Sequence, residues 1–126
     1  MTAPRFEAVP PAAGPRVQGF SGRGFVVESR LYDGLLLTPR EALDWDAPAL
    51  ADLEAGHVEA VLALDPAPEF LLLGTGALMA FPPRAFTAAL EARGIGVEAM
   101  DSRAAARTWS LLRGEGRWIA AALMPL

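Results

Sequence analysis

The apolar run Phe70–Leu73 leads directly into Gly74–Gly76, and this stretch constrains the fold more than any other part of the sequence. A short apolar run of this kind is typical of a strand buried on both faces, and the glycines predict a tight turn at its end. Parallel strands of α/β proteins have this pattern, and ligands of such folds gather at the carboxyl ends of the strands. We therefore expect the functional surface at this turn.

Predicted strands and helices alternate after residue 69. Hydrophobic spacing and capping residues predict a helix over 82–93, a strand over 95–100, a helix from Asp101 or Ser102 to Gly114, and a strand over 118–123. Prolines pre-set the first turn of the first helix, and Gly94 stands where a left-handed C-cap belongs. Strands joined by helices in this order predict parallel pairing with right-handed crossovers.

The first half of the chain favours antiparallel strands. Short β-prone runs lie over 17–20, 24–28 and 35–38, with turn residues between them at 21–23 and 32–34. Asp33-Gly34 is a strong hairpin signal, Trp45 is expected to anchor its segment on the sheet, and a short helix is predicted over 54–63. The prediction is a mixed α/β domain with antiparallel hairpins in its first half and parallel βαβαβ units in its second.

Residues 1–15 are rich in proline and alanine, and Phe6 and Val9 are their sizeable apolar side chains. Such a segment cannot bury enough surface to offset the entropy lost on ordering, so a flexible arm is predicted. Residues 16–126 are then predicted to form a single domain, since their number is typical of one.

The composition excludes several classes of function. The chain has no cysteine, which excludes disulfides, thiol catalysis and Cys-based metal sites, and no lysine, which excludes a Schiff base or a P-loop lysine. The net charge of −4 argues against nucleic-acid binding, which needs a basic surface. No apolar run reaches the roughly 20 residues of a membrane span, and the amino terminus lacks a secretory signal, so a cytoplasmic protein is expected.

Charges are unevenly distributed along the sequence. The segment 41–69 carries acidic residues and no arginine, whereas the segment 103–117 carries four arginines and one glutamate. In one interpretation these are solvated faces that attract each other within the fold. In the other they form a bipolar interaction surface, either for a partner or for a second copy of the chain in a homodimer.

The turn Gly74-Thr75-Gly76 is not a dinucleotide fingerprint. Met79 occupies the place of the third glycine in G-x-G-x-x-G, and no helix is predicted to begin there. One interpretation is a structural turn that needs a positive φ angle or a close backbone approach. The other is a nest of backbone N–H groups that binds a small anion.

Charged residues are expected beside this turn. Arg103 and Arg107 lie four residues apart on one helical stripe, and Glu115 and Arg117 are expected at the same end of the sheet. Together with Asp101, the last three are predicted to form a buried charge cluster, either an active site or an ion-pair lock. The candidate anion or partner surface comprises Gly74, Thr75, Gly76, Arg103, Arg107, Glu115 and Arg117.

His57 is the single histidine and lies in an acidic segment that is predicted to be a surface helix. A lone histidine among scattered carboxylates has neither the spacing of metal ligands nor a Ser-His-Asp arrangement. No catalytic, cofactor-binding or metal-binding residue is predicted.

The motifs that carry a family resemblance are Tyr32-Asp33-Gly34, Leu35–Pro39, Trp45, Phe70–Gly76, Gly94–Asp101, Ala105–Thr108, Glu115–Arg117 and Ala120–Leu123. In this order, over roughly residues 17–126, they resemble a family of small domains of unknown function. That family includes the mitochondrial assembly factor 3 of respiratory complex I (NADH:ubiquinone oxidoreductase) and its bacterial relatives. The resemblance implies a three-layer α/β fold and, for the mitochondrial members, a scaffolding role in building complex I.

One position departs from the family pattern. Trp109-Ser110 stands where the family tends to have an aromatic residue followed by asparagine. A role that needs a carboxamide is therefore not expected here, whereas a packing role for Trp109 remains.

Two functions follow as hypotheses. The first is a non-enzymatic interaction or assembly factor that docks protein partners, respiratory-complex subunits or assembly proteins, through the Gly74–Gly76 edge and the helix of Arg103 and Arg107. The second is a small-anion- or metabolite-binding domain, or an uncharacterised enzyme, built around the same turn.

Overall fold

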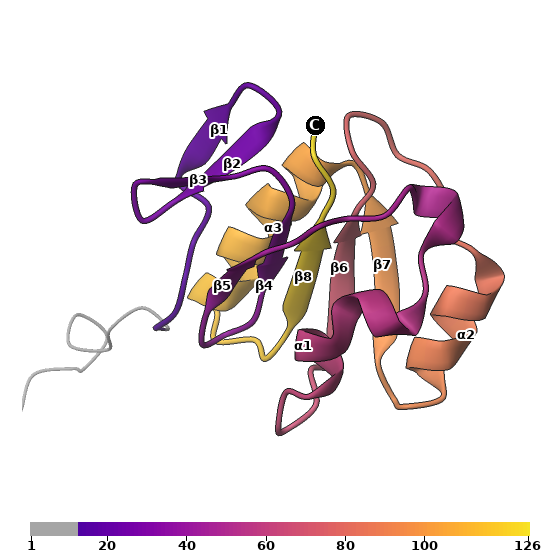
Figure 1. The fold of residues 1–126 in the computed structure, drawn as a ribbon. Coiled ribbons are helices and arrows are strands. Elements are labelled where there is room, and N and C mark those ends of the chain that lie inside the picture. The colour runs from indigo at the N-terminus through magenta and orange to yellow at the C-terminus, as the bar shows by residue number, and fades with distance from the viewer. Residues whose placement is uncertain (1–12) are drawn as a thin grey trace, which may run out of the picture.

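The computed structural model describes residues 13–126, which form two sheets with helices packed against them (Figure 1). The strands are β1 (Gly19–Ser21), β2 (Gly24–Val27), β3 (Arg30–Tyr32), β4 (Leu35–Leu37), β5 (Ala42–Asp44), β6 (Phe70–Gly74), β7 (Gly96–Met100) and β8 (Ala120–Leu123). The helices are η2 (Leu50–Asp52), η3 (Ala55–Val58), α1 (Glu59–Leu62), α2 (Arg84–Glu91) and α3 (Ser102–Gly114). Within residues 13–126, none of them is long and apolar enough to cross a membrane.

Strand β6 lies between β7 and β8 in the larger sheet, whose strand order is β5-β4-β8-β6-β7. It pairs in parallel with both neighbours, whereas β4 pairs antiparallel with β8 and β5. The chain passes from β6 through α2 to β7, and from β7 through α3 back past β6 to β8. Because such crossovers are right-handed, these opposite directions place α2 and α3 on opposite faces of the sheet (Figure 1).

The larger sheet separates two hydrophobic cores. Leu71 and Leu73 of β6 face the core under α1 and α2, whereas Leu72 faces the core under α3 and the small sheet β1-β2-β3. All of these leucines are buried, which explains why the strand is apolar at successive positions instead of alternating. The layers confirm the predicted three-layer α/β fold, with antiparallel strands from the first half of the chain and parallel βαβαβ units from the second.

The predicted helices form close to their expected bounds. The segment predicted over 54–63 forms η3 and α1. Gly94, with a φ of +79°, follows α2 as the predicted left-handed residue. Asp101 caps α3, because its carboxylate accepts the Ala104 N–H at 2.9 Å.

The predicted hairpin at Asp33-Gly34 is wrong. The strand before these residues, β3, pairs with β2 in the small sheet, and the strand after them, β4, belongs to the larger sheet. The chain turns instead at Glu28 and Ser29, between β2 and β3, where the φ angles are +51° and +67°. Neither residue is a glycine or asparagine, so the usual composition of such a turn is missing from the sequence.

Gly34 has a different role, which the packing of Trp45 explains. The Trp45 N–H donates to the Gly34 carbonyl at 3.0 Å, and Trp45 is 7% exposed. A Cβ atom on residue 34 would lie 2.3 Å from the Trp45 carbonyl oxygen. Glycine is therefore required for the close approach of these segments, and Trp45 anchors its segment on the sheet as predicted.

The predicted arm over residues 1–15 lies mostly outside the described residues, and its separation from one domain over 16–126 remains a prediction. Within its described part, the Ala13 carbonyl accepts a hydrogen bond from Arg113 at 2.8 Å. The Pro15 carbonyl accepts one from the Trp109 indole at 2.9 Å. Trp109 is fully buried, so it has the packing role that the resemblance implies.

Replacing Gly34 with alanine is expected to destabilise the fold by about 1–3 kcal/mol, because the added methyl group would overlap the Trp45 carbonyl. Urea unfolding measures the change. Gly56→Ala is the matched control, since Gly56 lies in η3 and a Cβ there meets no described atom within 4 Å. Equal destabilisation by both substitutions would contradict the close-approach explanation.

Candidate functional site

The turn after β6 lies where the sheet reverses its winding direction. The connections that follow β6 and β7 leave toward opposite faces, and such points form the ligand-binding crevice of many α/β proteins. Here the strand ends are tied to each other. The Thr75 N–H donates to the Met100 carbonyl at 2.9 Å, and the Ser102 N–H donates to the Gly76 carbonyl at 2.8 Å. These hydrogen bonds therefore close the position where other α/β proteins have a ligand-binding crevice.

The buried hydroxyl group of Ser102 completes this closure. Its Oγ accepts the Gly76 N–H at 2.9 Å and donates to the Met124 carbonyl at 2.7 Å. One fully buried side chain thus joins the carboxyl ends of β6, β7 and β8. A Cβ atom on Gly74 would lie 2.7 Å from Ser102 Oγ, which explains the glycine at the end of β6.

These contacts favour the structural interpretation of the Gly74-Thr75-Gly76 turn. The N–H groups of Thr75 and Gly76 donate to Met100 and Ser102, so neither is directed toward a bound anion. Gly76 also has a φ of +100°, in the region that favours glycine. The turn therefore has a structural role, since it fixes the strand ends that lie under the exposed loop.

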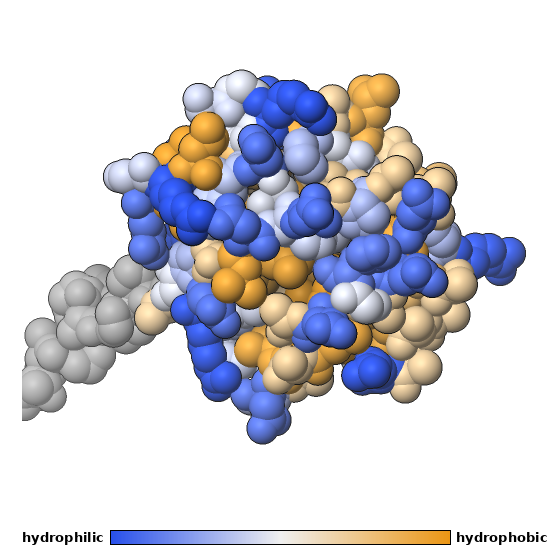
Figure 2. Space-filling view, viewed as in Figure 1, coloured by the Kyte–Doolittle hydropathy of each residue, from blue (hydrophilic) through white to orange (hydrophobic). Residues whose placement is uncertain are grey.

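The loop between β6 and α2 presents apolar side chains to solvent. Leu78 is 80% exposed, Met79 46% and Phe81 82%, and Figure 2 shows an apolar projection at the tip of this loop. Thr75 holds the loop in place, because its hydroxyl donates to the Leu78 carbonyl at 2.7 Å and accepts the Ala80 N–H at 3.1 Å. Sequence reasoning missed these residues, although large apolar side chains in a short loop before two prolines indicate an exposed patch.

Arg103 and Arg107 lie on the exposed side of α3, next to the small sheet. The Arg103 guanidinium lies 4.9 Å from the centre of the Phe20 ring. Arg107 lines a groove of about 310 Å³ together with Phe20 and Ser110. The structure thus places Arg103 directly after Ser102, at the same end of the sheet as the glycine turn, and Arg107 one helical turn away.

Glu115 and Arg117 lie at the other end of the sheet, and the predicted cluster with Asp101 and Arg107 does not form. Strands β6 and β8 are parallel, so residues before β8 lie beside residues before β6. Arg117 accordingly donates hydrogen bonds of 3.0 and 3.1 Å to the Glu69 carboxylate. The acidic and basic segments meet within the chain at this ion pair.

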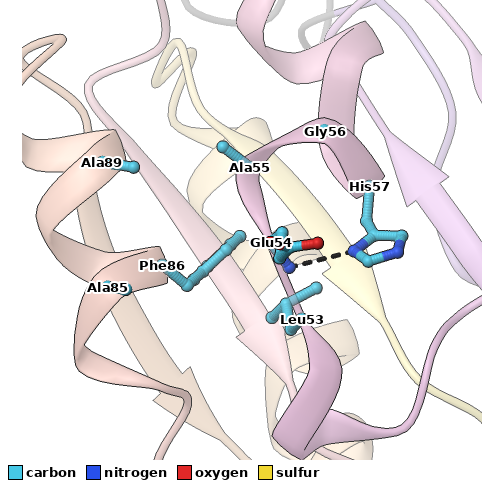
Figure 3. A pocket seen from close by; sticks show the side chains of 8 residues that line it. All are labelled: Leu53, Glu54, Ala55, Gly56, His57, Ala85, Phe86 and Ala89. Atoms are coloured by element: carbon cyan, nitrogen blue, oxygen red, sulfur yellow. Dashed lines mark hydrogen bonds between the residues drawn. The ribbon is translucent and has the colours of Figure 1, made fainter.

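A second groove, of about 560 Å³, lies between η3 and α2 (Figure 3). It is lined by Leu53, Glu54, Ala55, Gly56, His57, Ala85, Phe86 and Ala89. His57 is bonded within the fold. Its Nδ1 accepts the Glu54 N–H of its own turn at 2.9 Å, and its carbonyl accepts the indole N–H of the distant Trp45 at 2.9 Å. Among residues 13–126, no three His, Cys, Asp or Glu side chains are grouped to hold a metal ion.

Removing the Ser102 hydroxyl group in Ser102→Ala is expected to cost about 2–4 kcal/mol in the free energy of unfolding, because the buried Gly76 N–H loses its acceptor and the Met124 carbonyl loses a donor. Ser110→Ala is the matched control. Ser110 Oγ is buried and has no hydrogen-bond partner in the described part of the chain, so its removal should change stability by less than about 0.5 kcal/mol. Similar losses in both variants would contradict the role given to Ser102.

The Arg117–Glu69 pair is expected to stabilise the protein in a pH-dependent way. Hydrogen bonds from Arg117 lower the pKa of the Glu69 carboxyl group. Because the folded pKa is the lower one, the stabilisation is present above the unfolded value, near 4.5, and is lost as the pH falls through the folded value. Urea unfolding of Glu69→Gln should therefore show a loss of stability at pH 7 that is smaller at pH 3, below the unfolded value.

The control for this pH dependence is Glu98→Gln. Glu98 is exposed and belongs to neither of the ion pairs found between residues 13 and 126. Its substitution should have the same small effect at both pH values. A loss in Glu69→Gln that persists unchanged at low pH would show that the ion pair does not cause it.

Comparison with known proteins places the chain among domains without an assigned reaction. Residues 17–124 match the family described as "Protein of unknown function (DUF498/DUF598)". An uncharacterised protein of Rhodobacter capsulatus is 37% identical over 126 residues, which covers 89% of this chain and 93% of that protein. The crystal structure of a Bordetella parapertussis protein superposes with a TM-score of 0.82 at 33% identity, covering 93% of this chain and 100% of that one.

Vertebrate relatives of the chain have a functional name. The proteins of Danio rerio and Bos taurus named "NADH dehydrogenase [ubiquinone] 1 alpha subcomplex assembly factor 3" are 32% and 31% identical to this chain, over 90% and 86% of its length. The chain spans 66% and 60% of the length of these relatives. With the match over residues 17–124, the chain belongs to the DUF498/DUF598 family of proteins of unknown function, as its resemblance predicts.

Proposed function

We propose that this protein is a non-enzymatic interaction or assembly factor, similar in role to an assembly factor of respiratory complex I. Its relatives in Danio rerio and Bos taurus are named as assembly factors, and that name supports the proposal. The chain spans about two thirds of their length or less. Assigning the partners and the activity of those proteins to this one is therefore part of the proposal. A cytoplasmic location belongs to the same proposal.

The exposed loop after β6 is the observation that carries the proposal. The strand ends beneath it are sealed by Ser102, whereas Leu78 and Met79 stand 80% and 46% exposed above them. Thr75 fixes the loop from within, so little conformational entropy is lost when a partner covers it. Exposed apolar side chains on a preorganised loop favour binding to a protein over binding of a small polar ligand.

The charges beside this loop define the kind of protein that fits it. Arg103 lies at the same end of the sheet as the loop, and Arg107 follows one turn further along α3. An apolar loop with Arg103 at the same end of the sheet suits a partner that has an apolar groove with acidic side chains on one rim, because such charges steer association and fix orientation. Glu115 and Arg117 are not part of this surface, since they lie at the other end of the sheet.

The anion- or metabolite-binding alternative has weaker support from the geometry. Its predicted ligands are separated, because the N–H groups of Thr75 and Gly76 are used within the fold and Arg117 pairs with Glu69. The docking function requires none of these groups to be free.

Capture of the tagged protein from cells of its source organism, with partners identified by mass spectrometry, tests the docking function. Subunits or assembly proteins of the respiratory NADH dehydrogenase are the expected partners. Leu78→Asp and Arg103→Glu should each lower their recovery about tenfold, since a lost contact worth about 1.4 kcal/mol changes an affinity by that factor.

Leu31→Ser is the matched control, because Leu31 is also a large exposed side chain, 53% exposed, but lies on β3 of the small sheet. It should leave recovery unchanged. Absence of respiratory-complex partners would contradict the proposed function. Equal losses of recovery in Leu78→Asp and Leu31→Ser would contradict the proposed docking site.

A further inference from the structure

The charges of α2 are placed in the reverse of the order that a helix favours. Arg84 is its first residue and Glu91 its last, and there is no acidic residue in the first turn and no basic residue in the last. The helix macrodipole favours anions at the amino-terminal end and cations at the carboxyl-terminal end. Neither side chain belongs to the ion pairs found between residues 13 and 126. In a single copy of the chain both charges are therefore unfavourably placed.

The outward face of α2 is otherwise made of small side chains. Phe86 and Leu90 are buried in the core, whereas Ala85, Ala88 and Ala92 are exposed. At 100° per residue, Ala88 lies directly opposite the buried pair, in the middle of the outward face. Because alanine is small, another helix can pack on this face with a distance between helix axes at the short end of the usual range.

Phe81 closes one end of this face. Its ring is 82% exposed, and it shares a groove of about 490 Å³ with Arg84, Ala88 and Glu91. The groove thus combines an aromatic end wall, an alanine floor, one cation and one anion. Along the helix, the cation and the anion lie on either side of Ala88. Such a surface is complementary to itself under a two-fold rotation.

We propose that α2 is a self-association surface and that a second copy of the chain binds there with its own α2 antiparallel. Arg84 lies four residues before Ala88, and Glu91 lies three residues after it. A two-fold axis near Ala88 therefore brings Arg84 of one copy to the level of Glu91 of the second copy, on the same flank, and the pair occurs twice by symmetry.

This pairing removes the unfavourable placement of both charges. In the antiparallel pair, Arg84 lies beside the carboxyl-terminal end of the neighbouring α2, and Glu91 lies beside its amino-terminal end. Each charge then meets the end of a helix dipole that attracts it, in addition to its ion-pair partner. Phe81, which precedes α2, is positioned to cover the carboxyl-terminal turn of the neighbouring helix.

Sedimentation velocity of the full chain over a range of concentrations tests the proposal. We expect a monomer–dimer equilibrium that weakens as salt is raised, because exposed ion pairs are screened. Arg84→Glu and Glu91→Arg should each raise the dimer dissociation constant at least tenfold, because each places like charges side by side twice. The double variant Arg84→Glu/Glu91→Arg should restore the dissociation constant to within about threefold of the original.

Further variants separate association from effects on folding. Arg84→Glu improves the match to the helix dipole, so thermal melting at concentrations where the chain is monomeric should show equal or higher stability while association is lost. Ala88→Arg should abolish the dimer, whereas Ala63→Arg, at an exposed alanine after α1, should not. Arg107→Glu, on the opposite face of the sheet, should also leave the dimer intact.

A chain that stays monomeric at all concentrations and salt levels would overturn the proposal. So would a double variant that associates no better than the single ones, because rescue requires that Arg84 and Glu91 meet across two copies. The docking function of the β6–α2 loop is tested separately by Leu78→Asp, so failure of one proposal does not decide the other.

Discussion

The carboxyl ends of the parallel strands β6, β7 and β8 are joined by the buried hydroxyl group of Ser102, and the candidate surface depends on its hydrogen bonds. Ser102 accepts the N–H of Gly76 and donates to the carbonyl of Met124, while its own N–H donates to Gly76. For these bonds to form, α3 must begin directly against the end of β6, and the absence of a side chain on Gly74 makes room for it. The bonds thereby set where α3 begins, and with it the position of Arg103.

Closing this end of the sheet changes what the fold can do there. In open α/β sheets, the reversal of winding direction leaves a crevice in which backbone N–H groups meet a ligand. Here Thr75 and Gly76 use those groups within the chain, and the Thr75 hydroxyl fixes the loop above. In the proposed docking function, recognition is left to side chains on the outside of the loop, which have the apolar character of a protein contact and not that of an anion site.

The parts of the fold that sequence reasoning predicted are those specified by local patterns. Apolar runs, prolines and C-cap glycines mark β6, α2 and α3, because hydrophobic period and capping act within a few residues. Contacts between distant segments were not predictable in this way. Gly34 is a glycine because of Trp45 and not because of a turn, and Arg117 lies beside Glu69 because β6 and β8 are parallel. Each depends on register and packing that emerge when the sheet has formed.

The opposite crossovers also give the molecule two independent outward helices. The proposed self-association through α2 would leave α3 and the tip of the β6–α2 loop free, since α2 and α3 cover opposite faces of the sheet. Burying one leucine or methionine contributes about 1.5–3 kcal/mol, so Leu78 and Met79 together supply less than the roughly 8 kcal/mol of micromolar binding. A dimer displays the loop twice, and linked contacts raise the overall affinity by effective concentration without any new interaction. Pairing of α2 would thus strengthen docking at a surface that is small in a single copy.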